Sequence, residues 1–221
     1  MNQDWEKFAK TNPRYYIALD SCCEHDFWRK GEENFQNFIL PVLEKYKIKR
    51  DSALDFGCGL GRYTFPLRKY FDNVVGVDVS DAMFDLARKE VVSRNIENVF
   101  LKNNEQFFGS DQKFDFIFCA NVFQHIEQSE EIENIFAKFG NISIGYCYLQ
   151  FDTRPIDFLY KIKMSLPDWL LPKAHRHGIR RIRRNAEWVR ALSNWMGFDV
   201  IEEFNPNSKY HYFLLRSFIR H

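Results

Sequence analysis

Three glycines within five residues constrain the fold of this chain more than any other feature of its sequence. Gly57, Gly59 and Gly61 follow the apolar segment 52–56, in a chain of 221 residues that contains only ten glycines. Glycine tolerates positive φ angles and lets a ligand approach the backbone closely. The start of a helix after such a turn favours a carboxylate or a phosphate. We therefore predict a strand at 52–56, a tight binding turn, and a helix over 61–70.

The segments around this turn alternate between strand-like and helix-like patterns. Further strands are expected at 73–78, 98–102, 113–119 and 142–151, and helices at 80–95, with Ser80 as N-cap, and at 128–139. Such alternation is typical of parallel strands joined by helices. The strands expected at 198–204 and 210–219 are joined by a short turn, so they should be antiparallel. The sequence predicts an α/β fold with an open, mostly parallel sheet, one reversed strand, and helices on both faces.

The chain shows no internal repeat and no Gly/Ser linker, which favours one continuous domain over residues 1–221. Residues 1–47 lack strand signals, and a helical pattern over 31–46 is interrupted at Pro41. We expect this part to form an N-terminal helical cap. The remaining parts are a core at 48–152, an insertion at 153–184, and a C-terminal helix and strand pair at 185–221.

An acidic residue closes the second expected strand. Asp78 lies seventeen residues after Gly61, where a carboxylate can accept hydrogen bonds from two ribose hydroxyls. The spacing GxGxG differs from the GxGxxG fingerprint of nicotinamide and flavin dinucleotide proteins. A nicotinamide-dependent oxidoreductase is therefore the weaker alternative. A tight turn that binds nothing is a second alternative, which the position of Asp78 disfavours.

Together these motifs resemble the class I S-adenosylmethionine-dependent methyltransferases. LDFGCGLG at 54–61 looks like the first motif of that family, VVGVDVSDAMFDLAR at 74–88 like the second, and KFDFIFCANVFQHI at 113–126 like the fourth-strand motif. The resemblance implies a Rossmann-like sheet of seven strands with the last one reversed. It also implies that the chain is a single methyltransferase domain with S-adenosyl-L-methionine as its cofactor. These motifs are specific for the cofactor and not for the methyl acceptor.

The resemblance further implies which residues bind the cofactor. Those at the first strand serve its methionine part: Asp55, which orients the turn and reaches the amine through water, and Gly57, Gly59 and Gly61. Those after the second strand serve its adenosine part: Asp78 on the ribose, with Val79 and Met83 packed beside it. Asn104 stands where the family often has an aspartate that binds the adenine amino group. Asn121, after the fourth strand, should lie near the sulfonium.

His125 is the candidate catalytic residue. It follows the fourth strand on the face where an acceptor would lie, so its imidazole could take a proton from a hydroxyl or amine during methyl transfer. The alternative is a histidine that packs the cofactor pocket or bonds the backbone. A protein that binds the cofactor without catalysis is an alternative for the chain as a whole.

The insertion at 153–184 is too long for an ordinary connection, which needs about 2–6 residues, and too apolar for a free loop. We expect a helical cap over the acceptor pocket, with Asp152 and Arg154 at its base. An insertion packed outside the sheet, or a dimer contact, is the alternative. The insertion ends in a basic run without acidic residues: Lys173, Arg176, Arg180, Arg181, Arg183 and Arg184. The run predicts either a rim for an anionic acceptor or, slightly favoured, a solvated basic loop.

Composition restricts the partners. A formal net charge of +1 gives no general attraction to nucleic acid or membranes, and no apolar run approaches the roughly 20 residues of a membrane span. The chain also lacks the N/D-P-P-Y/F motif of methylases that act on exocyclic base amines. Its five cysteines form no CxxC pair and predict neither a metal site nor a disulfide framework. We expect reduced thiols in a cytoplasmic protein without a secretory signal, acting on a small-molecule acceptor.

Overall fold

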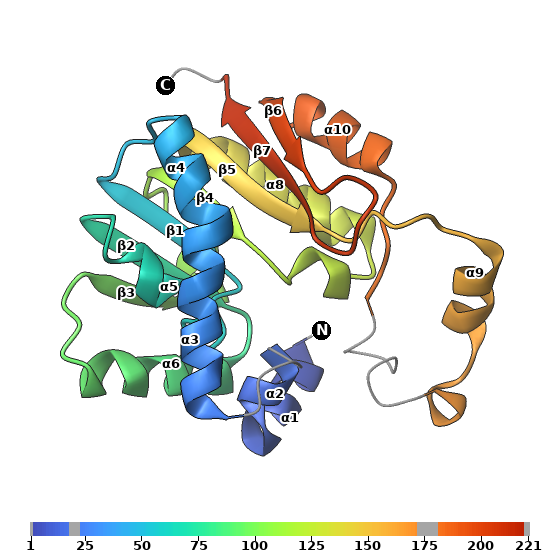
Figure 1. Cartoon of the computed structure of the whole chain (residues 1–221), viewed down its shortest axis with the longest axis horizontal. Helices are drawn as coiled ribbons and strands as arrows, with labels where there is room; N and C mark the ends of the chain where they lie inside the picture. Colours follow the sequence, from blue (N-terminus) through green and yellow to red (C-terminus); the bar gives the residue numbers. More distant parts are fainter. Residues whose placement is uncertain (1, 18–22, 172–180, 219–221) are drawn as a thin grey trace.

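Seven strands form a single sheet in the computed structural model, which describes residues 2–17, 23–171 and 181–218 (Figure 1). The strand order is β3-β2-β1-β4-β5-β7-β6. The strands are β1 (Ser52–Phe56), β2 (Asn73–Asp78), β3 (Val99–Asn103), β4 (Phe114–Cys119), β5 (Ser143–Phe151), β6 (Phe198–Phe204) and β7 (His211–Ser217). β7 pairs antiparallel with both β5 and β6, and the first five strands pair parallel. The expected mostly parallel sheet with one reversed strand is confirmed.

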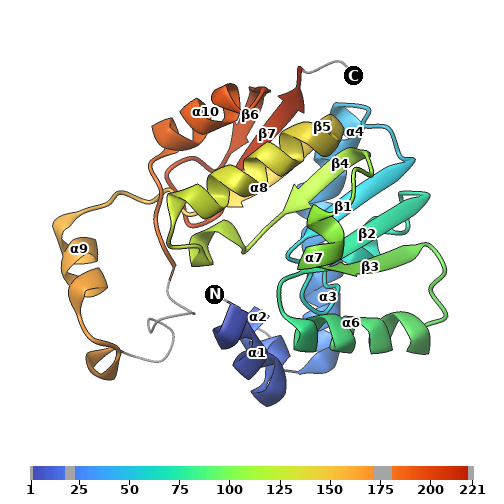
Figure 2. The same cartoon turned by 180° about the vertical axis from the view of Figure 1, so that it is seen from behind.

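Helices cover both faces of the sheet. In Figure 1 the near face carries α3 (Glu24–Asn34), the π-helical turn η1 (Phe35–Ile39), α4 (Leu40–Lys45) and α5 (Thr64–Leu67). Figure 2 shows α7 (Asn104–Phe108), α8 (Ser129–Ile142) and α10 (Ala186–Trp195) over the opposite face. The two faces have separate apolar cores, one around Leu54 and Phe136 and the other around Phe35 and Phe116. All six residues of β4 are buried because a strand covered on both faces has no solvent side.

Six more helices and helical turns are described. They are α1 (Asn2–Thr11), α2 (Pro13–Ile17), α6 (Asp81–Ser93), the 3-10 turns η2 (Phe123–His125) and η3 (Asp168–Leu170), and α9 (Phe158–Ser165). α6 begins as expected, with the Ser80 hydroxyl accepting a hydrogen bond from the Met83 N–H at 3.2 Å. Of the described helices, none has the length and apolarity to cross a membrane.

Two helical expectations need correction. The helix predicted over 61–70 shrinks to the four residues of α5, because Gly61 has a φ of +91° that a right-handed helix cannot contain. The helix broken at Pro41 begins earlier than expected, at Glu24, and becomes π-helical just before the proline. There the Leu40 N–H reaches back five residues to the Phe35 carbonyl. Proline has no N–H to continue the regular pattern and its ring crowds the preceding turn.

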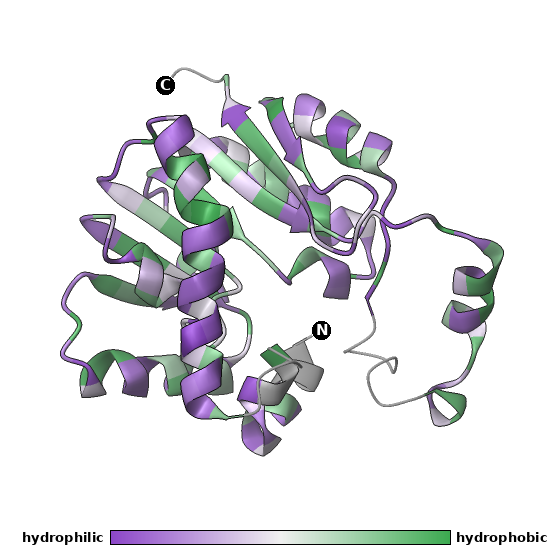
Figure 3. Cartoon of the chain, viewed as in Figure 1, coloured by the Kyte–Doolittle hydropathy of each residue, from purple (hydrophilic) through white to green (hydrophobic). Residues whose placement is uncertain are grey.

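The insertion between β5 and α10 extends away from the sheet, with α9 at its outer end (Figure 1). Figure 3 shows hydrophobic positions along this helix, where Phe158 and Leu159 are 74% and 76% exposed. Residues 172–180, which include the first half of the expected basic run, lie outside the described part of the chain.

Candidate functional site

The glycine turn lies at the centre of the sheet, between the carboxyl ends of β1, β2 and β4. Gly57 and Gly59 have φ angles of +80° and +54°, which favour glycine. A Cβ atom at Gly57 would overlap the Val122 side chain, and one at Gly59 would lie 2.9 Å from Ile17. The N–H groups of Gly57 and Cys58 both donate to the Val77 carbonyl, at 2.7 and 2.9 Å. The turn is therefore held against β2 and has no room for side chains.

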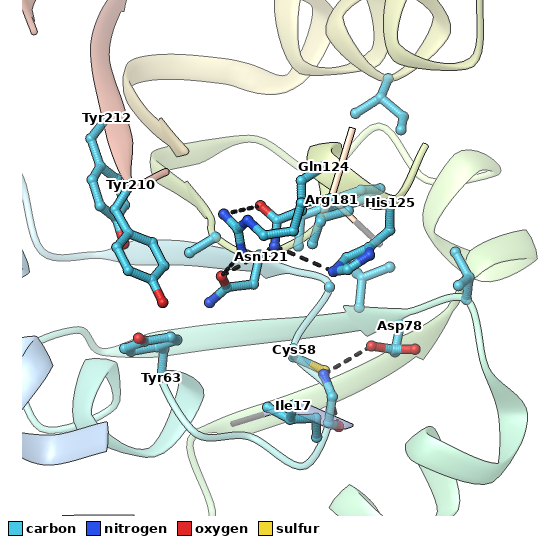
Figure 4. Close-up of a pocket in the computed structure, with 18 of the residues that line it drawn as sticks. Ile17, Cys58, Tyr63, Asp78, Asn121, Gln124, His125, Arg181, Tyr210 and Tyr212 are labelled. Carbon is cyan, nitrogen blue, oxygen red and sulfur yellow. Dashed lines mark hydrogen bonds between the residues drawn. The ribbon is translucent and has the colours of Figure 1, made fainter. Parts of the chain in front are cut away.

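The Asp78 carboxylate connects this turn to the next helix. One oxygen accepts the Gly59 N–H at 2.8 Å, and the other accepts the Ser80 N–H at 3.0 Å (Figure 4). Burial raises the pKa of Asp78, and the hydrogen bonds from Ser80 and Gly59 oppose that shift. Each carboxylate oxygen has more than one acceptor position, so the group can also bind ligand hydroxyls in the cleft beside it.

That cleft has a volume of about 1210 Å³. Of the ten residues predicted for the site, eight line it: Gly57, Gly59, Asp78, Val79, Met83, Asn104, Asn121 and His125. Met83 is almost fully buried on α6, and Asn104 begins α7, which Asn103 caps. Helix α1 packs against α6 at this end of the cleft, where the Glu6 carboxylate accepts the Ala82 N–H at 3.2 Å.

The other two predicted residues do not line the cleft. Asp55 is buried under the turn and accepts a hydrogen bond from the Thr64 hydroxyl at 2.6 Å. Burial raises the pKa of Asp55 to about 7, against the hydrogen bond from Thr64. Gly61 faces the Phe65 ring, whose Cζ would lie 2.9 Å from an added Cβ. Both residues thus shape the turn from behind, and Asp55 does so through its hydrogen bond to the first residue of α5.

Asn121 and His125 follow β4 and line the cleft. Asn121 has a φ of +61° and is held on both sides: its N–H donates to Gln150 at 2.7 Å, and its side-chain oxygen accepts from Gln124 at 3.2 Å. His125 ends the turn η2, where its Nε2 lies 3.3 Å from the Gln124 side-chain nitrogen. Figure 4 shows both residues facing the cleft from the loop above the glycine turn.

Arg62 is a site residue that sequence reasoning missed. It lines the cleft, is only 6% exposed, and its guanidinium lies 5.3 Å from the Phe27 ring and 5.8 Å from the Tyr63 ring. Its Nε has no hydrogen-bond partner among the described residues. A buried guanidinium is costly without an anion beside it. The sequence signal was present, since Arg62 directly follows the third glycine, whereas α5 is too short to supply the expected helix N-terminus.

Arg181 is the second residue that was missed as a site residue. It extends from the insertion to Asp152, Gln124, Asn121 and the Lys209 carbonyl, with distances of 3.1, 3.0, 3.4 and 2.6 Å. Asp152, which is 0% exposed, also accepts three hydrogen bonds from Arg154, one from its backbone N–H and two from its guanidinium. Burial acts to raise the pKa of Asp152, but the hydrogen bonds and charges of the two arginines outweigh it and lower the pKa.

This network corrects the slightly favoured expectation of a solvated basic loop. The described members of the run are anchored: Arg183 donates its N–H to the Tyr160 hydroxyl at 2.9 Å, and Arg184 donates to the Ile126 and Glu127 carbonyls at 2.8 Å. Arg154, Arg181 and Arg183 line the cleft. The other members, Lys173, Arg176 and Arg180, lie outside the described residues.

Comparison with known proteins decides what kind of domain carries this cleft. A family model described as a methyltransferase domain matches residues 54–142, the segment that runs from β1 through α8. These residues match a methyltransferase domain, and the comparisons below support a class I S-adenosylmethionine-dependent methyltransferase.

Curated members of the family show the same relationship over the core. The ribosomal protein L11 methyltransferase of Caldicellulosiruptor saccharolyticus is 27% identical over 139 residues, which are 62% of this chain and 44% of that protein. The ubiquinone biosynthesis O-methyltransferase of Rickettsia bellii is 27% identical over 118 residues, 48% of this chain and 49% of that protein. The chain thus spans less than half the length of these relatives.

Two solved structures share the fold over nearly the whole chain. The magnesium protoporphyrin IX methyltransferase of Synechocystis PCC 6803, with bound SAH, has a TM-score of 0.70 at 16% identity and covers 97% of this chain and 98% of its own. The PH0226 protein of Pyrococcus horikoshii OT3 has a TM-score of 0.69 at 23% identity and covers 96% and 98%.

Proposed function

We propose that the chain binds S-adenosyl-L-methionine and transfers its methyl group to a small-molecule acceptor. The observation that carries the proposal is the Asp78 carboxylate, bonded to the Gly59 N–H at the edge of a large cleft. A carboxylate so placed accepts hydrogen bonds from a ribose, while the glycine turn leaves room for a ligand that side chains would exclude. Family membership and the matched methyltransferase domain support the same cofactor.

The residues along the cleft fit the parts of this cofactor. Asp78 would bind the ribose, with Val79, Met83 and Asn104 around the adenosine. Arg62, a buried cation that lacks a carboxylate partner among the described residues, would bind the methionine carboxylate. Asp55 supports the turn from beneath through Thr64. The cleft thus offers a hydrogen-bond acceptor for the ribose of the cofactor and a cation for its methionine carboxylate, which supports the proposal.

The reaction requires positioning more than it requires acid–base chemistry. When bound, the cofactor supplies a methyl group that is already activated on a sulfonium. The chain must then hold an acceptor atom in line and exclude water; positioning of this kind contributes about 7–11 kcal/mol in favourable cases. Asn121, held by Gln150 and Gln124, is suited to define that position. His125 would either take the acceptor proton, worth about 10²–10⁴-fold in rate, or pack the pocket.

The acceptor is proposed to be a small molecule, with negative charge favoured by the arginines of the insertion. Nucleic acid is disfavoured by the missing base-methylase motif and by the near-zero net charge. A reduced, cytoplasmic setting is part of the proposal and is supported by the four described cysteines, which are free thiols. A non-catalytic cofactor-binding protein is the second candidate; release of S-adenosylhomocysteine in an acceptor screen would separate the two.

Calorimetry with wild-type protein and an Asp78→Ala variant tests the proposal. We expect binding of S-adenosylmethionine and S-adenosylhomocysteine but not of NAD. Hydrogen bonds to a charged group are worth about 1.5–3 kcal/mol, so Asp78→Ala should weaken cofactor binding roughly 10- to 150-fold with the fold intact. Asp85→Ala, which removes an exposed carboxylate from the neighbouring helix α6, is the control and should bind normally. Binding of NAD alone would favour the oxidoreductase.

A further inference from the structure

Tyrosines line the end of the cleft that lies away from Asp78. Figure 4 shows Tyr63, Tyr210 and Tyr212 on one side of Asn121, and Asp78 on the other. Tyr63 comes from the segment before α5, whereas Tyr210 and Tyr212 come from the end of the β6–β7 turn and from β7, so two segments distant in sequence converge there. The Arg181 guanidinium lies 5.2 Å from the Tyr210 ring. Flat aromatic faces beside a guanidinium suit a planar aromatic ligand.

Cations from the insertion line the same cleft beyond these rings. Arg154, Lys163 and Arg183 all face it, and Tyr160 lies under the Arg183 guanidinium at 4.3 Å. Burial lowers the pKa of Lys163, and so do the positive charges of Arg154 and Arg183. Lys163 therefore lies within electrostatic range of both arginines.

The carboxylates nearby do not balance this charge. Arg154 and Arg181 share the single carboxylate of Asp152, and Arg183 lies 3.8 Å from Asp157, whose side chain is largely exposed. Lys163 has no ion pair within the described part of the chain. Four cations thus face two carboxylates, and an anionic ligand would relieve their repulsion.

We infer that this end of the cleft binds an aromatic acceptor that carries an oxyanion substituent, a carboxylate or a phosphate. The ring would lie beside Tyr63 and Tyr210, and the oxyanion would bind Arg154, Lys163 and Arg183. The inference rests on the proposed methyl transfer, because it assigns this subsite to the methyl acceptor. A neutral acceptor would leave the repulsion among the cations unrelieved.

Binding of four small probes, followed by NMR titration of the full chain saturated with S-adenosylhomocysteine, tests this inference. Benzoate and phenyl phosphate carry both ring and oxyanion, benzyl alcohol lacks the charge, and cyclohexanecarboxylate lacks the aromatic ring. We expect benzoate or phenyl phosphate to bind about tenfold more tightly than benzyl alcohol, and several-fold more tightly than cyclohexanecarboxylate. The tighter of the two aromatic anions identifies the oxyanion. Equal binding of benzyl alcohol, or binding of no probe, overturns the inference.

Lys163→Gln tests where the oxyanion of the ligand binds. It should weaken benzoate or phenyl phosphate about tenfold, leave benzyl alcohol unchanged, and leave the affinity for S-adenosylmethionine unchanged. Lys161→Gln is the matched control, since Lys161 is exposed on the same helix and does not line the cleft. An equal loss in both variants overturns the assignment. Calorimetry that finds no S-adenosylmethionine binding, while the aromatic anions still bind, would instead reject the proposed function and leave the subsite in place.

Discussion

The two ends of the cleft are built in different ways. The proposed cofactor end consists of backbone turns at the carboxyl ends of adjacent strands, with Gly57, Cys58 and Gly59 bonded to β2 and Asp78. The proposed acceptor end consists of long side chains from elements distant in sequence. Arg181, for example, connects the insertion to Asn121, 60 residues away, and to the hairpin at Lys209. One end is therefore fixed by the sheet and the other by side-chain contacts that the insertion brings in.

This difference predicts that the two ends can be changed separately. A variant at the glycine turn should alter cofactor binding, and a variant in the insertion should alter acceptor use. Four experiments test that separation, beginning with the largest expected effect.

Replacement of residues 156–180 by a short Gly/Ser linker should keep cofactor affinity near normal and lower methyl transfer by about 10³-fold, because the acceptor would lose much of the positioning that the cleft provides. Calorimetry and release of S-adenosylhomocysteine measure the two effects. The control is the pair Phe158→Ser and Leu159→Ser, which changes exposed residues that do not line the cleft. Full turnover without the insertion would show that it is not a cap over the acceptor.

Gly57→Ala should weaken cofactor binding by at least about 30-fold. The new methyl group would overlap Val122, and the φ of +80° is unfavourable for alanine. Strain of about 1–2 kcal/mol adds to an overpacking cost of about 1–3 kcal/mol. Gly109→Ala, at a φ of −77°, is the control. Thermal unfolding checks that both variants fold, and unchanged affinity in a folded Gly57→Ala protein would place the cofactor elsewhere.

His125→Gln should lower the rate at saturating cofactor by about 10- to 100-fold, at or below the lower end of general-base effects, and leave cofactor affinity unchanged. This pattern is the signature of a group that acts on the acceptor. His25→Gln, an exposed histidine on α3, should have no effect. Weaker cofactor binding would make His125 a residue of the cofactor pocket instead.

Asp55→Asn tests how the buried Asp55 carboxyl beneath the glycine turn affects stability as the pH changes. Because the pKa of Asp55 is raised to about 7, the folded state favours the protonated carboxyl. The stabilisation that the protonated carboxyl gives to the folded state is complete below pH 3.8, the pKa of this group in the unfolded chain. It is lost as the pH rises through 7, by up to about 1.4 kcal/mol per pH unit. Asparagine mimics the protonated form. The free energy of unfolding in urea should therefore fall less between pH 5 and pH 8 in the variant than in wild type.

Asp72→Asn, at an exposed position, is the control for that experiment. The pKa of Asp78 is also raised by burial and adds a loss in the same direction in both proteins, so the difference between them reports Asp55 together with its charge interaction with Asp78. Parallel pH profiles in wild type and Asp55→Asn would show that Asp55 is ionised in the folded protein at pH 5.

The sequence was sufficient for the cofactor end because its signals are local. Strand boundaries at 52–56, 73–78 and 198–204 agree with the structure to the residue, since buried parallel strands leave continuous apolar runs between turn residues. The cap at Ser80 and the register of Asp78 with the glycines follow from spacing along one βαβ unit. The same local reasoning overestimated the helix after Gly61, because the pattern does not show that the glycine adopts a positive φ.

Tertiary structure alone decided the acceptor end. The sequence placed Asp152 at the base of the insertion and Arg181 in its basic run, but it did not predict their partners. The fold buries Asp152 and Gln150 fully and joins them to the loop after β4. The left-handed φ of Asn121 and the convergence of Tyr63 with Tyr210 depend likewise on contacts across 60 to 150 residues of chain. A turn is specified by residues that are neighbours in sequence, whereas a buried charge is stable only where folding brings its partners to it.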